Sequence, residues 1–300
     1  MLTALYIPGP AKTPILRPVI SIFALAAVTA TVLLTGTWLA VLVVFGLLAT
    51  VAAHEGAHAW RGHRHGLKLE QYMIGFGPRL YSRTTRSGVE VGARIWPLGA
   101  FVKFVDDADE DLPGWPRLDM ILAGPLANIL IGVLLMFAVQ LGIGVTPVDA
   151  AKAAGTVSAE MAKSMVDTIV HLPVIAADMA RGAISGTPPP DESRTMSPVE
   201  VGRLAHEATT SYSPWVNSAL LIGAISFALG VANLLPIPPL DGGLATVTIL
   251  ESGLSKIKRR RVRIPSVAVK AVTYVVFAIL AIALLAGVVL DLSHPTPNPF

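Results

Sequence analysis

Long apolar stretches separated by polar segments dominate the chain, and this pattern predicts a multi-span membrane protein. A helix needs about 20 mainly apolar residues to cross the hydrocarbon core of a bilayer. Five stretches approach or exceed this length, with glycine, proline or charged residues between them. They are residues 19–34, 38–60, 118–145, 214–232 and 267–290. We therefore expect a polytopic α-helical membrane protein with about five transmembrane helices.

Residues 69–104 follow a different pattern, in which apolar and polar residues alternate. Such alternation is typical of β-strands with one buried face. Glycines interrupt it at five places, namely Gly75, Gly77, Gly88, Gly92 and Gly99. We expect short β-hairpins in a small membrane-associated region over residues 63–113, ending in an acidic, solvated turn at residues 106–111.

These patterns divide the chain into eight segments. In order they are a cytoplasmic leader (1–18), two transmembrane helices (19–62), the β region (63–113), a third transmembrane helix (114–145), an extracytoplasmic helical segment (146–212), a fourth transmembrane helix with a proline-rich continuation (213–251), a basic cytoplasmic loop (252–265), and a last transmembrane helix with its tail (266–300). Smaller helices are expected at residues 156–182, 198–209 and 244–252, with a Pro/Ser-rich linker at 186–197. No cleavable signal peptide is expected, because residues 1–18 lack a small-residue cleavage pattern.

Charge distribution predicts the orientation of these segments in the membrane. Only 14% of the residues are charged, against about 25% in soluble domains. Lysine and arginine number nine in residues 61–117 and seven in 252–270, whereas residues 146–212 hold five beside eight acidic residues. Because cytoplasmic loops carry the excess of Lys and Arg, the first two segments are expected inside the cell and the third outside. A net charge of only +3 fits a membrane protein with no nucleic-acid partner.

An H-E-x-x-H sequence at residues 54–58 closes the second apolar stretch. Residues four apart share one face of a helix, so His54 and His58 can bind one metal ion together, with Glu55 beside them as a candidate general base. His54 follows Trp38 by 16 residues, or about 24 Å along a helix axis. The pair is therefore expected inside the apolar slab, near its far face.

A metal site is the favoured interpretation of this sequence over a structural histidine pair. Ionisable residues are costly within a membrane segment and mark functional sites by default. The chain has no cysteine, which excludes disulfides and thiolate zinc sites. Any zinc must be held by His, Asp or Glu side chains.

Two more polar residues stand out in apolar surroundings. Asn128 lies in the third apolar stretch and is equally compatible with a hydrogen bond between helices. Asp241 follows residues 236–240, whose three prolines cannot continue a helix. Irregular backbone at membrane depth is viable only when it is buried in protein or lines a wet cavity. Asp241 alone also fits a helix N-cap.

Together these segments resemble the site-2 protease family of intramembrane zinc metalloproteases, peptidase family M50. The resemblance rests on the H-E-x-x-H sequence, on GPLAN at residues 124–128 and on NLLPIPPLDG at residues 233–242. The sequences YMIGFGP at 72–78 and PLGAFVK at 97–103 are also similar to the bacterial branch that clears anti-sigma factors.

The resemblance implies one Zn²⁺ per chain and a role for each matching residue. Three residues would bind the metal, namely His54, His58 and Asp241. Glu55 would be the catalytic base, and Asn128 and Asn233 would position the substrate near the site. The β region would lean into the membrane and present an edge to the substrate.

The activity that the resemblance implies is that of a metalloendopeptidase in the plasma (inner) membrane of a bacterium, with its active site toward the cytoplasm. Its substrate would be a single-span membrane protein, such as an anti-sigma factor or a signal-peptide remnant, cut within or near its transmembrane segment in regulated intramembrane proteolysis. The bilayer and this substrate are the expected partners.

One segment departs from the family pattern. The bacterial branch often carries a PDZ domain after the third span, but residues 146–212 are too few for a PDZ fold with its connectors. We therefore expect a protease without a PDZ domain. Two alternatives from other classes are a metal or solute transporter that uses the same His/Asp cluster, and an inactive scaffold. A transporter predicts internal repeats, which the sequence does not show, and a scaffold predicts the loss of a site residue.

Overall fold

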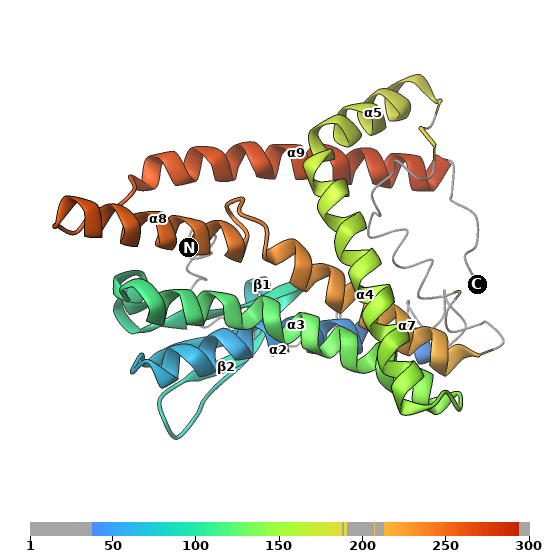
Figure 1. Cartoon of the computed structure of the whole chain (residues 1–300), viewed down its shortest axis with the longest axis horizontal. Coiled ribbons are helices and arrows are strands. Elements are labelled where there is room, and N and C mark those ends of the chain that lie inside the picture. The colour runs from blue at the N-terminus through green and yellow to red at the C-terminus, as the bar shows by residue number, and fades with distance from the viewer. Residues whose placement is uncertain (1–37, 188, 191–206, 208–212, 294–300) are drawn as a thin grey trace.

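The computed structural model describes residues 38–187, 189–190, 207 and 213–293. Over these residues the protein is mostly helical, with one small β-sheet (Figure 1). The predicted first span, residues 19–34, lies outside the described residues, as does the predicted helix 198–209 apart from Glu207.

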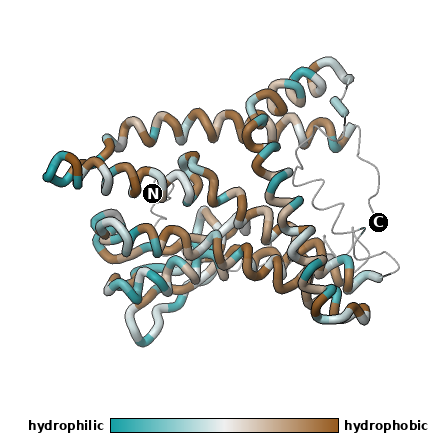
Figure 2. Tube along the Cα trace, in the orientation of Figure 1, coloured by the Kyte–Doolittle hydropathy of each residue, from teal (hydrophilic) through white to brown (hydrophobic). Residues whose placement is uncertain are grey.

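Four helices among the described residues are long and apolar enough to cross a membrane, which confirms four of the predicted spans. They are α2 (Trp38–Arg64, with its apolar part at Val41–Arg64), α3 (Gly114–Gly142), α7 (Pro214–Asn233) and α9 (Ser266–Ser293, with its apolar part at Val267–Ser293). Figure 2 shows hydrophobic residues along most of the length of each. Between 28% and 39% of the residues in the apolar part of each span are buried inside the protein.

The α2 helix continues past its predicted end at residue 60 to Arg64. Its last turn contains Arg61, His63 and Arg64, and positive side chains are favourable at the carbonyl end of a helix. The α3 helix begins at Gly114, where the predicted third transmembrane segment starts and one turn before its apolar stretch, and contains Pro125. Neighbouring helices make such a proline tolerable in a membrane segment, and α3 packs against both α2 and α7.

The β region forms one long hairpin whose strands are β1 (Leu69–Thr84) and β2 (Glu90–Phe104). Residues 71–74 of β1 pair on one side with residues 103–100 and on the other with residues 90–93. Both partner stretches belong to β2, so this strand must bend sharply to lie on both sides of residues 71–74. The region is therefore one long bent hairpin, where short hairpins were predicted. The bends coincide with Gly75, Gly77 and Gly99, which have positive φ.

The acidic stretch after the hairpin is a 3-10 helix, η2 (Val105–Asp111), where a solvated turn was predicted. Residues 147–185 form two helices, α4 (Pro147–Val170) and α5 (Leu172–Ser185). One helix was expected over residues 156–182, but the chain breaks at His171 because Pro173 has no N–H to continue the ladder. The part of this segment that the structure describes has no strand.

Helix α8 (Asp241–Lys258) begins after the proline-rich turn and, at 18 residues, is twice as long as the predicted helix 244–252. A cluster of buried apolar residues joins its start to β2, α3 and the turn after α2, and comprises Leu67, Phe104, Met120, Ile121 and Ala245. A second cluster joins α3, α4 and α7, and a third joins α5 to α9. The first cluster lies next to the candidate site and packs β2, α3 and α8 together there.

Candidate metal centre

His54 and His58 project from the same face of α2, one turn apart. Their Nε2 atoms lie 3.1 Å from each other, and the two rings meet edge to face with centroids 4.8 Å apart. His54 is only 7% exposed. The sequence therefore places two imidazole nitrogens side by side in a buried position, as the i, i+4 spacing predicts.

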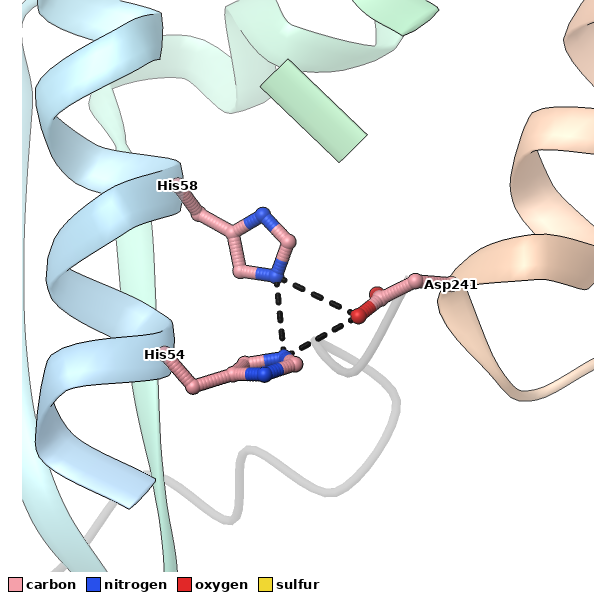
Figure 3. Close-up of side chains that lie close together, drawn as sticks. All are labelled: His54, His58 and Asp241. Carbon is pink, nitrogen blue, oxygen red and sulfur yellow. Dashed lines mark hydrogen bonds and ion pairs between the residues drawn. The ribbon is translucent and has the colours of Figure 1, made fainter. Parts of the chain in front are cut away.

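Asp241 faces this pair from the first residue of α8 (Figure 3). Its Oδ2 lies 3.0 Å from Nε2 of His54 and 3.3 Å from Nε2 of His58. The N-cap of α8 is Leu240, so Asp241 does not cap the helix, and its carboxylate is directed toward the histidines. Residues 187 positions apart in the chain thus meet at one point.

The proline-rich turn after α7 delivers Asp241 to the pair. Turn hydrogen bonds connect Ile237 to Leu235 and Leu240 to Ile237. The turn packs directly on the start of α8, where a Cβ at Gly242 would lie 2.2 Å from the carbonyl oxygen of Leu234. Only glycine fits at that position, so the close approach fixes where α8 starts and therefore where Asp241 points.

The three side chains fit a metal ion in donor type and spacing. They form a group of His and Asp ligand atoms that all lie within 4.8 Å of one another. Zinc bonds of about 2.0–2.1 Å in a tetrahedron place neighbouring ligands about 3.3 Å apart, close to the 3.0–3.3 Å observed here. Two imidazoles and one carboxylate are a donor set that zinc uses in proteins, with one coordination position left open.

Hydrogen bonds prepare the group for a cation. His58 donates from Nδ1 to the carbonyl oxygen of Met120 at 2.8 Å, which holds the ring with its Nε2 facing Asp241. Burial alone would raise the pKa of Asp241, but hydrogen bonds from His54 and His58 outweigh it and lower this pKa to about 2. The carboxylate is therefore ionised and carries the negative charge that attracts a metal ion.

Glu55 lies beside the group and contacts the β-hairpin. It is 8% exposed, and its carboxylate accepts a hydrogen bond from the backbone N–H of Val102 in β2. Tyr72 of β1 donates a hydrogen bond to the backbone carbonyl of Ala52 in α2. Burial and the nearby charge of Glu55 raise the pKa of the Tyr72 phenol, which keeps it protonated as a donor. The hairpin is thus attached to α2 next to the candidate base.

Helix α3 passes directly in front of the histidines at Gly124. A Cβ at this position would lie 2.3 Å from Nε2 of His58 and 2.7 Å from Nε2 of His54. Asn128 lies one turn further along α3 and is 2% exposed, with a buried Oδ1 that has no hydrogen-bond partner among the described residues. Its backbone oxygen accepts a bond from Ser226 of α7 at 3.0 Å, so the contact between the helices uses the backbone and not the Oδ1 atom.

Asn233 does not join the group in this structure. Its Nδ2 donates to the carbonyl oxygen of Leu229 one turn earlier in α7, at 3.0 Å. The structure therefore brings His54, His58 and Asp241 together with Glu55 beside them, and leaves the two asparagines on adjoining helices.

Sequence analysis missed a polar cluster that connects α2 to α3 just beyond the histidines. Arg61 donates two hydrogen bonds to the carboxylate of Asp119, at 2.8 and 2.6 Å. His65 lies 2.6 Å from the same carboxylate. Asp119 precedes Met120, whose carbonyl orients His58. A lone acidic residue at the edge of an apolar span was the available signal, because such residues usually have a partner.

Comparison with known proteins identifies the family of the chain. Residues 42–283 match peptidase family M50. The chain is 35% identical over 114 residues to zinc metalloprotease Rip1 of Mycobacterium tuberculosis, a match that covers 34% of this chain and 28% of that protein. It is 36% identical over 117 residues to zinc metalloprotease Rip1 of Mycolicibacterium smegmatis, covering 34% of this chain and 29% of that protein. The matches thus span less than a third of the length of these curated relatives.

The family match includes α3, α7 and both parts of the candidate metal group, covers almost all of the apolar part of α2 and ends within α9. It agrees with the resemblance found in the sequence alone. The chain belongs to peptidase family M50.

Proposed function

We propose that this protein is an intramembrane zinc metalloendopeptidase that hydrolyses a peptide bond within or next to the transmembrane segment of another membrane protein. One observation carries the proposal. His54 and His58 at the end of an apolar helix meet Asp241 at distances of 3.0 and 3.3 Å, with Glu55 next in sequence to the first histidine. Two relatives named zinc metalloproteases support zinc as the metal.

In this proposal His54, His58 and Asp241 hold one zinc ion. Zinc bound by such a set supplies a water molecule with a pKa lowered to about 7 and polarises the scissile carbonyl group. The hydrogen bond from His58 to Met120 holds the ring with Nε2 directed at the ion. The ionised Asp241 balances part of the positive charge.

Glu55 acts as the general base and then as the general acid. It takes a proton from the attacking water and passes it to the leaving amine, as a buried carboxylate beside the site can do. The backbone N–H of Val102 donates to this carboxylate and limits its movement. Asn128 and Asn233 are proposed to position the substrate, with the unpartnered Oδ1 of Asn128 as the supporting observation for the first.

The substrate is proposed to bind as an extended strand, because a helix hides its carbonyl groups in hydrogen bonds. Among the described residues, 100–104 of β2 pair with a strand along one side only, that of β1, and on the other side the N–H of Val102 points to Glu55. N–H groups alternate in direction along a strand, so that of Ala100 also points outward. A substrate strand added here would run past the catalytic base.

Replacing Ala100 by proline tests this binding mode, since proline removes the outward N–H. Ala100→Pro is expected to lower cleavage about tenfold in a purified assay with a single-span substrate, by the loss of about one hydrogen bond at the edge. Ala100→Ser keeps the N–H and serves as the control. Normal cleavage by Ala100→Pro would rule out strand addition at this edge.

The proposed setting is the plasma membrane of a bacterium, with the site toward the cytoplasm. The basic residues on the segments 61–117 and 252–270 support this orientation. Regulated proteolysis of a single-span protein, such as an anti-sigma factor or a signal-peptide remnant, is the proposed role. Helices α4 and α5 occupy part of the place where the bacterial branch often carries a PDZ domain.

Co-expression with candidate single-span proteins tests the function. The wild-type chain is expected to produce a shortened product on a blot, whereas Glu55→Gln should lose cleavage and keep its zinc. A transporter that uses the same cluster would keep metal or solute uptake in Glu55→Gln, and an inactive scaffold would produce no shortened product from either chain. Either result would contradict the proposal.

A further inference from the structure

The turn between α8 and α9 carries a dense group of positive charges. Residues 256–263 contain six Lys or Arg side chains, and the hydrophilic end of α8 is visible in Figure 2. Two of the six, Arg261 and Arg263, pair with Asp111 of η2. The other four are exposed and have no side-chain hydrogen bond or ion pair among the described residues, namely Lys256, Lys258, Arg259 and Arg260.

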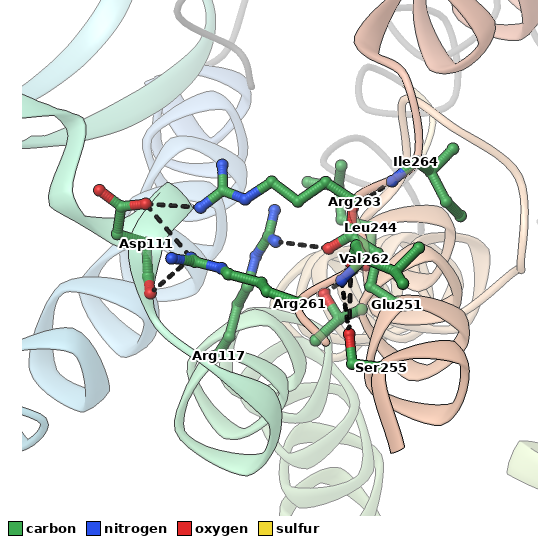
Figure 4. A network of polar contacts seen from close by, with 10 residues as sticks. Asp111, Arg117, Leu244, Glu251, Ser255, Arg261, Val262, Arg263 and Ile264 are labelled. Carbon is green, nitrogen blue, oxygen red and sulfur yellow. Dashed lines mark hydrogen bonds and ion pairs between the residues drawn. The ribbon is translucent and has the colours of Figure 1, made fainter. Parts of the chain in front are cut away.

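Hydrogen bonds and ion pairs give the turn a defined structure (Figure 4). The backbone N–H of Val262 donates to Oγ of Ser255 at 2.9 Å. The N–H of Ile264 donates to Glu251 at 2.9 Å, and the same carboxylate pairs with Arg117 of α3 at 3.3 Å. These bonds and the pairs with Asp111 fix the turn to the start of α3, so its remaining charges form a stable surface.

Apolar side chains lie next to the four cations. Ile257 is 80% exposed, and Ile249 and Leu250 one to two turns earlier in α8 are 56% and 50% exposed. The apolar part of α9 begins only a few residues later at Val267, which is 75% exposed. Cations and exposed apolar residues side by side at the end of a membrane span match the level of lipid headgroups.

We propose that the α8–α9 turn binds the anionic headgroups of phospholipids, with the four free cations on the phosphates and Ile257 among the upper acyl chains. Charge complementarity selects this occupant, because four cations within five residues attract an anionic surface and Ile257 adds an apolar contact that a free phosphate ion lacks. The proposal concerns lipid binding and does not depend on peptide cleavage.

Helix α8 links this surface to the candidate metal centre. Asp241 is its first residue and Lys258 its last, and 18 residues span about 27 Å. Ala245 in the first turns of α8 packs against Met120 and Ile121 of α3. Lipid bound at one end would therefore hold the whole helix against α3 and stabilise the position of Asp241.

The test uses the full chain in a zwitterionic detergent and measures the midpoint of thermal unfolding as phosphatidylglycerol is added. The test variant replaces the four free cations by glutamine. A matched control replaces four other exposed cations that have no side-chain partner among the described residues, namely Arg64, Lys68, Arg83 and Arg86. Phosphatidylcholine and inorganic phosphate are the reference additions.

We expect phosphatidylglycerol to raise the midpoint of the wild type and of the control, while the test variant needs at least about tenfold more lipid for half the shift. Phosphatidylcholine and inorganic phosphate should leave all three unchanged. An equal loss in the control variant would show charge attraction without a site and would overturn the proposal. So would an unchanged response of the test variant, or an equal response to inorganic phosphate.

Discussion

Helix α2 and the residue that follows it, His65, carry two pairs of side chains with the same spacing, and each pair faces one carboxylate from another helix. His54 and His58 face Asp241 of α8. About two turns further on, Arg61 and His65 face Asp119 of α3. Both groups are partly or fully buried and both bring distant parts of the chain together, but they differ in what they can bind.

The difference is the guanidinium group. Arg61 donates one hydrogen bond to each carboxylate oxygen of Asp119, at 2.8 and 2.6 Å. Arginine has no lone pair to offer to a metal. That group is complete as an ion pair and can only hold α2 to α3. In the first group two imidazoles can each offer an Nε2 lone pair beside an ionised carboxylate. A metal site on this helix therefore requires both members of the pair to be histidine.

Removing the carboxylate of each group should give the largest contrast. Asp241→Asn is expected to reduce the bound zinc from about one per chain to near zero and to lower cleavage at least about a thousandfold, because a ligand and its charge are lost. Asp119→Asn should keep about one zinc per chain in excess metal. Metal analysis of the purified proteins measures the bound zinc of both variants.

The comparison fails if the two variants lose zinc equally, since Asp119 would then act as a ligand. It also fails if Asp241→Asn binds zinc as the wild type does. A thermal unfolding curve for each variant separates loss of metal from loss of fold.

The second prediction concerns the affinity for zinc, where Asp119 should have a smaller effect. Asp119 holds the start of α3, and the next residue supplies the carbonyl that orients His58. Mutation of a residue that orients a metal ligand without binding the metal itself typically weakens metal affinity by about 10- to 100-fold. We expect Asp119→Asn to lie at the lower end of this range, about tenfold weaker than wild type, in a competition experiment with a chelator.

Asp178→Asn is the matched control for that experiment, because it breaks an exposed ion pair with Arg181 on α5. It should leave the zinc affinity unchanged. A purely structural role for Asp119 would lower the unfolding midpoint and leave the affinity of the folded protein as it was, so the two measurements together decide between holding the helices and positioning the ligand.

The contrast between the two groups also explains how much the sequence could predict. The spacing of His54 and His58 is a local property of one helix, so the pair and its shared face followed from the sequence directly. The four described spans followed from composition and length in the same way. Asp241 was different, since its own neighbourhood fitted a helix cap equally well, and only the resemblance to a family connected it to the histidines.

Contacts between distant segments explain what was missed. The pairing of Asp119 with Arg61 depends on how α3 lies against α2, and no pattern in either segment encodes that placement. The same holds for the bond from Val102 to Glu55, which requires the bends of the hairpin at its glycines. The break at His171 could have been predicted, because Pro173 stood within the proposed helix.

The smallest expected effect is the most direct test of the rule that both members must be histidine. Arg61→His would place a second pair of imidazoles, with His65, in front of Asp119. We expect a second and weaker zinc equivalent, so that bound zinc rises from about one toward two per chain only at high metal concentration. Arg61→Gln has no imidazole and should stay at one, and a titration of the dialysed protein followed by metal analysis measures both. If Arg61→His also stays at one, the guanidinium is not what distinguishes the groups, and the difference must lie in how closely the backbones of α2 and α3 approach.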